Sequence, residues 1–302
     1  MKTWVPSESV AAALSDLPGI ECAVYNSTTP MPEGVEEVEV WVPPLVTVPD
    51  VPGTLARMTS LRLVQTVTAG VEPYRPHMPE GAVLCNARGV HDAGTAEWAV
   101  GAMIAVLREF PGFVDAQRRG EWTYHPTDVL ADSRVVIVGY GSIGSALERR
   151  LEGFEVEVVR VARRARDGVH AMDELPALLP DADVVVLLVP ATPDTAGMVD
   201  AAFLARMKDG AVLVNAARGS IVDTDALVAE LKTGRLRAAL DVTAPEPLPE
   251  GHPLWSAPNV LITPHIAGST PASERRTLRL IRAQLERYVA GEELVNVITD
   301  EY

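Results

Sequence analysis

The chain has 302 residues and a formal net charge of −15, and this acidic balance argues against a nucleic-acid partner, since nucleic-acid phosphates need a basic surface. No apolar run reaches membrane-spanning length and the first residues lack the apolar stretch of a secretion signal, so we expect a cytoplasmic protein with no membrane partner. Cys22 and Cys85 lie inside apolar stretches, which predicts buried thiols and neither a disulfide framework nor a metal site.

The first ninety residues alternate between helix-like and strand-like patterns, which predicts a parallel sheet with covering helices. Residues 67–71, Val-Thr-Ala-Gly-Val, are the end of one such strand and a turn of small residues. Their backbone N–H groups could hold an anion, although the turn taken alone is better explained as purely structural. The expected elements are a helix over 6–14 and strands over 20–25, 38–42, 61–67 and 82–85.

Residues 92–110 predict a long helix whose length and apolar face suit an element that spans two domains. Residues 118–127 follow it and combine arginines with Trp122 and Tyr124. An exposed aromatic arm of this kind is often an interface. The alternative is a surface loop with Trp122 turned inward.

Residues 135–138 are a short β-branched run, which predicts a buried strand. Gly139, Gly141 and Gly144 follow at G-x-G-x-x-G spacing, and a helix-like stretch comes next. In this context the first glycine permits the turn, the second lets the backbone approach a pyrophosphate, and the third lets helix and strand pack closely. We therefore predict a dinucleotide site here; the alternative is a glycine-rich turn that binds nothing.

The next strand, expected over 154–161, ends without the Asp or Glu that bonds the ribose 2′-hydroxyl in NAD sites. Ala162 stands there, and Arg163 and Arg164 follow. An arginine fork suits a 2′-phosphate, so we expect NADP(H) to be preferred, with NAD(H) as the alternative. The arginines could also be a solvated loop, and Asp167 could blur the preference.

The α/β rhythm continues to the end of the chain, as in a sheet covered on both faces. Three charged residues follow strand ends in this half: Arg218, Glu246 and His265. Such ends converge on one crevice, where an arginine can bind a carboxylate and a glutamate can orient a proton-transferring histidine. Together with a nicotinamide these are the parts for 2-keto acid reduction. The expected elements are strands over 181–190, 211–215, 238–242 and 260–263 and helices over 224–233 and 272–290.

From roughly residue 60 to 275 the chain closely resembles the D-isomer-specific 2-hydroxyacid dehydrogenases. The matching pieces are Gly139-Tyr-Gly-Ser-Ile-Gly, Leu188-Val-Pro-Ala-Thr-Pro-Asp-Thr, Val214-Asn-Ala-Ala-Arg-Gly-Ser-Ile-Val-Asp, Ala239-Leu-Asp-Val-Thr-Ala-Pro-Glu-Pro-Leu and Thr263-Pro-His-Ile-Ala-Gly-Ser-Thr. The resemblance implies that Arg218 binds the substrate carboxylate and carbonyl. It implies that His265 is the general acid in reduction and the base in oxidation, and that Glu246 orients it. It also implies that backbone N–H groups hold the substrate carboxylate at Ala69, Gly70 and Val71.

The resemblance also implies that Asp241 contacts the nicotinamide carboxamide, and we expect it in one cofactor site with the glycine-rich loop. Its full set is Gly139, Tyr140, Gly141, Ser142, Ile143, Gly144, Arg163, Arg164, Pro190, Thr192, Thr195, Ala216 and Asp241. The family fold implies two doubly wound, Rossmann-like α/β domains, one flavodoxin-like and one dinucleotide-binding, with a cleft between them. We expect a discontinuous substrate domain of residues 1–93 and 271–302, an inserted cofactor domain of residues 94–270, and a homodimer.

We therefore expect an oxidoreductase that transfers a hydride between NADP(H) and a small 2-keto or 2-hydroxy acid, of the glyoxylate or hydroxypyruvate type. One alternative is a dehydrogenase of a bulkier 2-keto acid, suggested by Trp41 and Tyr74 near the pocket strands. The other is a non-catalytic, nucleotide-sensing binding protein. The first sixty residues match the family only loosely, and these residues help to shape the pocket.

Overall fold

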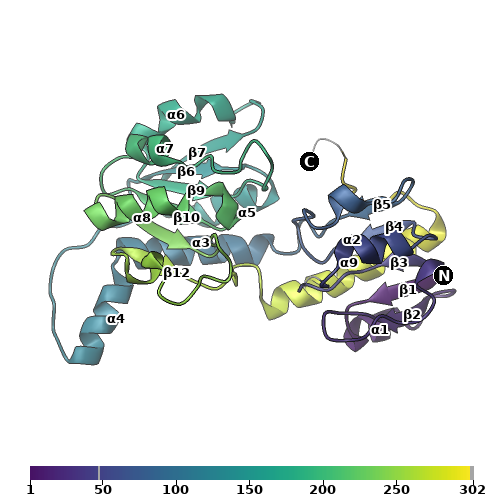
Figure 1. The fold of residues 1–302 in the computed structure, drawn as a ribbon. Helices are drawn as coiled ribbons and strands as arrows, with labels where there is room; N and C mark the ends of the chain where they lie inside the picture. Colours follow the sequence, from purple (N-terminus) through teal and green to yellow (C-terminus); the bar gives the residue numbers. More distant parts are fainter. Residues whose placement is uncertain (47, 300–302) are drawn as a thin grey trace. The chain divides into compact units, whose positions relative to one another are not determined.

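The structure, a computed structural model, describes residues 1–46 and 48–299 (Figure 1). The chain divides into two compact units. One comprises Met1–His91 and the stretch from Pro271 onward, and the other comprises Asp92–Thr270. Each contains one parallel sheet with helices on both faces, so the predicted α/β fold class is confirmed. Among the described residues, no helix combines the length and apolarity needed to cross a membrane.

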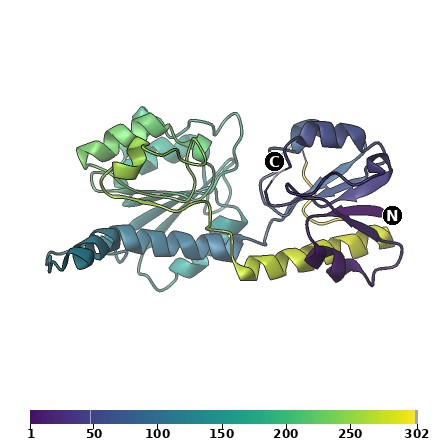
Figure 2. The same ribbon diagram turned by 60° about the horizontal axis from the view of Figure 1, so that its bottom comes forward.

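The first unit has five parallel strands in the order β2-β1-β3-β4-β5, which is the flavodoxin-like order. Helix α2 packs on one face of this sheet, and α1 and α9 pack on the other (Figure 2). The strands are β1 (Lys2–Val5), β2 (Glu21–Val24), β3 (Val38–Trp41), β4 (Leu63–Gln65) and β5 (Val83–Cys85). The helices are α1 (Glu8–Leu14), α2 (Val51–Arg57) and α9 (Pro271–Ala290).

The second unit has seven parallel strands in the order β12-β11-β10-β9-β6-β7-β8. Chain order reverses between β6 and β9, which is where sheets of this kind bind ligands. The strands are β6 (Arg134–Val138), β7 (Glu157–Ala162), β8 (His170–Ala171), β9 (Val184–Leu187), β10 (Val212–Asn215), β11 (Arg237–Leu240) and β12 (Val260–Ile262). The helices are α3 (Asp92–Leu107), α4 (Phe110–Arg119), α5 (Ser142–Leu151), α6 (Leu175–Leu178), α7 (Ala201–Arg206) and α8 (Thr224–Thr233).

The central strands of this unit are apolar at every position because both of their faces are covered. Val135 and Ile137 pack against α3 and α5, whereas Val136 and Val138 face the layer that contains α6, α7 and α8. All four side chains are fully buried. This two-sided burial holds the carboxyl edge of the sheet, and the loops that follow it, in place.

The helix predicted over 92–110 is present as α3, and a second helix that was not predicted follows it. α3 ends at Leu107, Glu109 has φ +53°, and α4 starts at Phe110 with a proline in its first turn. The arm that follows is exposed: Trp122 is 96% and Tyr124 87% accessible, which excludes the inward-turned Trp122. Cys85 is buried as predicted, whereas Cys22 is only half-buried.

Candidate active site

The glycine-rich loop after β6 is shaped by close backbone approaches. Gly139 has φ +105°, and a Cβ atom there would lie 2.5 Å from the backbone carbon of Leu188. A Cβ at Gly144 would lie 2.9 Å from the carbonyl oxygen of Gly139, so glycine is needed where α5 meets the strand. At Gly141, by contrast, no atom of the described chain lies within 4 Å of such a Cβ. The loop is therefore closely packed at Gly139 and Gly144 and open at Gly141.

The open side is the amino end of α5, where the first N–H groups have no partner within the helix. An anion placed there would gain these donors and the positive end of the helix dipole. A dinucleotide pyrophosphate suits this end chemically. The predicted residues that begin the helix are Ser142, Ile143 and Gly144.

Tyr140 braces the loop against its neighbours. Its hydroxyl donates to Glu148 on α5, which also accepts a hydrogen bond from Arg160 on β7. The guanidinium groups of Arg160 and Arg166 lie 5.7 and 5.8 Å from the centre of the Tyr140 ring. The hydrogen bond from Arg160 is the main cause that lowers the pKa of Glu148 below its ordinary value of 4.5.

The turn after β7 carries the arginines expected at a 2′-phosphate. Arg163 and Arg164 are exposed, and half-buried Ala162 ends the strand. Arg166 makes a contact that the sequence did not reveal: its Nη2 donates to the carbonyl oxygen of Tyr140 at 2.6 Å. This bond ties the arginine-rich turn to the glycine-rich loop, so both lie at the same edge of the sheet.

Pro190, Thr192 and Thr195 lie in one compact loop after β9. The Thr195 hydroxyl donates to the carbonyl oxygen of Pro190 at 2.6 Å, and it accepts the N–H of Thr192 at 2.9 Å. Ala216 follows the adjacent strand β10 and donates its N–H to Leu187 at 3.4 Å. These predicted cofactor residues therefore sit at the ends of neighbouring strands.

The predicted catalytic pair is in direct contact. His265 Nδ1 and Glu246 Oε1 are 2.6 Å apart, and their side chains are 49% and 41% exposed. His265 follows β12 and Glu246 follows the adjacent β11. His265 has φ +54°, a strained conformation for a side chain of this size, and its N–H donates to the carbonyl oxygen of Asp241 at 2.7 Å.

Asp241 also holds the histidine loop with its carboxylate. The side chain is 3% exposed and accepts three hydrogen bonds. Their donors are the Thr263 hydroxyl (2.5 Å), the Ile266 N–H (2.9 Å) and the Ala267 N–H (2.8 Å). The resemblance assigned Asp241 to the nicotinamide; the structure gives it this second task, which spacing alone did not indicate.

Arg218 lies on the next loop, after β10, and is half-buried. Buried Asn215 fixes its backbone, because its Nδ2 donates to the Arg218 carbonyl oxygen at 3.0 Å. Gly219 passes beneath the loop that carries Glu246: a Cβ there would lie 1.9 Å from the carbonyl oxygen of Thr243. Sequence reasoning assigned no role to Gly219, although a glycine directly after the arginine was the available signal.

The turn at residues 67–71 lies in the first unit, after β4. Every one of its carbonyl oxygens accepts a hydrogen bond from the protein. The pairs are His91 Nε2 to Val67 (2.8 Å), Ala87 N to Thr68 (2.9 Å), Asn86 Nδ2 to Ala69 (2.8 Å), Thr68 Oγ1 to Gly70 (2.7 Å) and Tyr74 N to Val71 (3.0 Å). Within the described chain, the N–H groups of Gly70 and Val71 donate to no protein acceptor.

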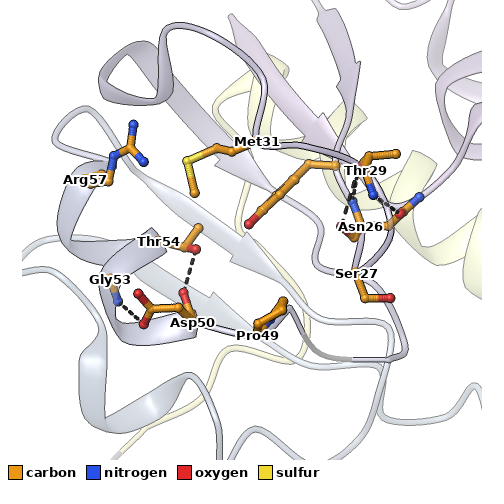
Figure 3. A pocket seen from close by; sticks show the side chains of 10 residues that line it. Asn26, Ser27, Thr29, Met31, Pro49, Asp50, Gly53, Thr54 and Arg57 are labelled. Carbon is orange, nitrogen blue, oxygen red and sulfur yellow. Dashed lines mark hydrogen bonds between the residues drawn. The ribbon is translucent and has the colours of Figure 1, made fainter.

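A separate hollow of about 320 Å³ lies in the first unit, between the loop after β2 and the start of α2 (Figure 3). Its polar groups are used in local turns: Asp50 accepts the N–H of Gly53 at 2.8 Å, and the Thr54 hydroxyl donates to the Asp50 carbonyl oxygen at 2.6 Å. None of its lining residues is a predicted site residue. Trp41 and Tyr74 do not open onto it, because they pack edge to face inside the core, 5.7 Å apart.

Comparison with known proteins places this site in a family. The profile described as "D-isomer specific 2-hydroxyacid dehydrogenase, NAD binding domain" matches residues 100–267. The glycerate dehydrogenase of Methylorubrum extorquens is 31% identical over 303 residues, covering 96% of this chain and 88% of the relative.

Two solved structures are similar over nearly the full length. One is a D-isomer specific 2-hydroxyacid dehydrogenase of Xanthobacter autotrophicus Py2 in complex with NADPH and MES, with a TM-score of 0.86 and 30% identity over 100% of this chain and 99% of that one. The other is the NADPH-dependent glyoxylate/hydroxypyruvate reductase of Sinorhizobium meliloti, with a TM-score of 0.84 and 27% identity over 98% of both chains. The chain therefore belongs, as its motifs predicted, to the D-isomer specific 2-hydroxyacid dehydrogenase family of NAD(P)-dependent oxidoreductases.

Proposed function

We propose that the protein reduces a small 2-keto acid of the glyoxylate or hydroxypyruvate type with NADPH. The observation that carries this proposal is the 2.6 Å pair of His265 and Glu246, which follows adjacent strands in the unit that holds the glycine-rich loop. A histidine held by a carboxylate is the proton donor that reduction of a ketone requires.

The bound nicotinamide supplies the hydride for this reaction. Glu246 accepts the Nδ1 proton of His265, which leaves Nε2 to give a proton to the carbonyl oxygen that becomes the hydroxyl. Arg218 binds the substrate carboxylate as a guanidinium fork and polarises the carbonyl beside it. The resemblance also assigns substrate-carboxylate binding to the turn at residues 67–71, where the N–H groups of Gly70 and Val71 donate to no protein acceptor in the described chain.

The preference for NADPH is supported by the turn after β7. Ala162 supplies no carboxylate to repel a 2′-phosphate, and exposed Arg163 and Arg164 follow it directly. The solved relative from Xanthobacter holds NADPH, and the one from Sinorhizobium is described as NADPH-dependent.

The burial of two aromatic residues supports a small substrate. Trp41 is fully buried and Tyr74 is 4% exposed, so neither lines an open space for a large substrate. Glycerate, on which one relative is named, is the 2-hydroxy acid that hydroxypyruvate yields on reduction.

We also propose that the protein acts as a homodimer through α4 and the arm after it. Trp122 and Tyr124 on the arm, and Phe110 and Val114 on α4, are all exposed apolar or aromatic side chains. A second copy would cover this surface. Sedimentation of the Trp122→Ala variant should give a weaker self-association than the unaltered chain.

The direct test compares rates with NADPH and NADH on glyoxylate, hydroxypyruvate, pyruvate and a bulky 2-keto acid. We expect the highest kcat/KM with NADPH and one of the two smallest acids. The double substitution Arg163→Ala and Arg164→Ala should raise the NADPH KM about tenfold, because an exposed charge-assisted pair contributes about 1.5 kcal/mol, and should leave the NADH KM within about twofold.

The same double substitution at Arg275 and Arg276 on α9 is the matched control, since it changes the net charge equally in the other unit. Equal changes in the two KM values after substitution of Arg163 and Arg164 would reject the 2′-phosphate assignment. Tight NADPH binding without turnover on any acid would favour the nucleotide-sensing alternative.

A further inference from the structure

The direction of each N–H group in the turn 67–71 is set by the carbonyl that precedes it. A peptide unit is planar and trans, so its C=O and the following N–H point in opposite directions. Holding the Ala69 oxygen in place therefore fixes the Gly70 N–H, and holding the Gly70 oxygen fixes the Val71 N–H. The groups that hold these two oxygens are Asn86 Nδ2 and Thr68 Oγ1.

Asn86 is the partner of this turn that comes from the adjacent strand. It follows β5, is 5% exposed, and uses its whole side chain: Nδ2 donates to Ala69 and Oδ1 accepts the N–H of Arg88 at 3.1 Å. Its own carbonyl oxygen accepts Gln65 Nε2 at 3.1 Å. The position of Asn86 therefore decides where the Ala69 oxygen is held.

The C-terminal segment, residues 295–298, forms hydrogen bonds with the backbone of Asn86. The Asn86 N–H donates to the Asn296 carbonyl oxygen at 3.1 Å. Asn296 Nδ2 donates in return to the carbonyl oxygens of Asn86 (3.3 Å) and Arg88 (3.0 Å). In Figure 1 this segment runs beside β5, where Val297 forms an antiparallel bridge with Cys85.

The segment is itself anchored to α9. Gln284 is fully buried and makes two hydrogen bonds with the backbone of Val295. Its Nε2 donates to the Val295 carbonyl oxygen at 2.8 Å, and its Oε1 accepts the Val295 N–H at 3.0 Å. Asn296 has φ +56°, a conformation that asparagine and glycine tolerate better than other residues. The link from α9 to the turn is therefore an unbroken series of hydrogen bonds.

We propose that the C-terminal segment is a positioning element for substrate binding, and that Asn296 and Asn86 transmit its position to the Gly70 N–H. This inference rests on the proposed function, in which that N–H meets the substrate carboxylate. Asn296 touches neither substrate nor cofactor in this scheme; it acts through Asn86.

Asn296→Gly is the informative variant, because glycine keeps the backbone conformation and removes only the side-chain donor. Asn259→Gly is its matched control: Asn259 has φ +58°, is exposed, and lies in the other unit. For both variants, kcat and KM for glyoxylate, the NADPH Kd, and hydrogen exchange of the peptide that contains residues 66–72 would be measured.

We expect Asn296→Gly to raise the glyoxylate KM about fivefold, the loss that one neutral hydrogen bond represents, with kcat and the NADPH Kd within about twofold. Exchange in the 66–72 peptide should accelerate in this variant and not in Asn259→Gly. An unchanged KM overturns the inference, and so does a parallel loss of kcat and NADPH affinity, which indicates general loosening. If the unaltered protein turns over no 2-keto acid, the proposed function fails, and the exchange of the 66–72 peptide then decides only whether the C-terminal segment positions the turn.

Discussion

Gly219→Ala is the substitution that tests most sharply how the active-site loops fit together. Gly219 directly follows Arg218, and the loop that carries Glu246 crosses over it. A Cβ at Gly219 would lie 1.9 Å from the Thr243 oxygen and 2.1 Å from its carbonyl carbon. Observed Cβ atoms essentially never approach closer than 3.0 Å, and the atoms met here belong to backbone, which cannot rotate away. One of the two loops must therefore move by about 1 Å.

Movement of either loop changes the distance between Arg218 and Glu246. Movement of the loop after β11, which carries Glu246, also strains the 2.6 Å contact between Glu246 and His265. The loop that carries Glu246 has little freedom, because the Thr224 hydroxyl at the start of α8 donates a hydrogen bond to the Ala244 carbonyl oxygen at 2.8 Å. A misplacement of about 1 Å at a reacting centre costs about 100-fold in rate. Overpacking of this kind also lowers the free energy of unfolding by about 1–3 kcal/mol.

The assay is NADPH oxidation with glyoxylate, together with urea unfolding and NADPH binding. Gly234→Ala is the control: Gly234 has φ +74° and, among the described residues, nothing within 4 Å of a Cβ, so alanine adds backbone strain of about 1–3 kcal/mol without a clash. We expect the control to lose stability and keep its kcat/KM, and Gly219→Ala to lose kcat/KM about 100-fold. A folded Gly219→Ala variant within about threefold of the unaltered enzyme would refute this account of the loops.

Three further predictions follow from contacts in the second unit. His265→Ala should lower kcat by about 100- to 10,000-fold while NADPH still binds, and near-normal turnover would remove the proposed general acid. Glu148→Gln should destabilise the protein at neutral pH, because the lowered pKa of Glu148 contributes stability that is present above about 4.5 and is lost as the pH falls through the lowered value. Urea midpoints of the two proteins should therefore converge as the pH falls below 4.5; a difference independent of pH would contradict this. Asp241→Asn should lower kcat with little effect on the NADPH Kd, because an amide presents a donor to the loop it must hold; a selective loss of NADPH binding would instead indicate that the predicted contact with the nicotinamide dominates.

Much of the fold was predictable because its signals are local. The helix α8 has the predicted bounds, with Gly234 in the left-handed conformation just beyond it. β1 was missed because it is only four residues long and includes Thr3, a polar residue that is fully buried in the structure. Helix α4 was not predicted; Pro111, which suits the first turn of a helix and cannot continue the preceding one, was the signal present in the sequence.

The contact between Glu246 and His265 could be anticipated, because both residues follow strands that a doubly wound sheet places side by side. The groups that support them could not. The three bonds that Asp241 makes to residues 263–267 depend on side-chain direction at a strand end. The close approach of Gly219 to Thr243 depends on the path of a loop. Neither has a periodic signature in the sequence, so a structure was needed to find them.

The two turns proposed to bind anions achieve the same exposure of N–H groups by opposite means. The loop at Gly139–Gly144 depends on missing side chains, because backbone and helix come too close for a Cβ. The turn at residues 67–71 depends on side chains that hold carbonyl oxygens, above all Asn86 and Thr68. Enlarging a residue should therefore damage the first turn, whereas removing a donor elsewhere in the unit should damage the second. Since a donor can be weakened in small steps and a steric clash cannot, we expect that affinity for the acid can be adjusted from outside the proposed site, whereas cofactor binding at the glycines cannot.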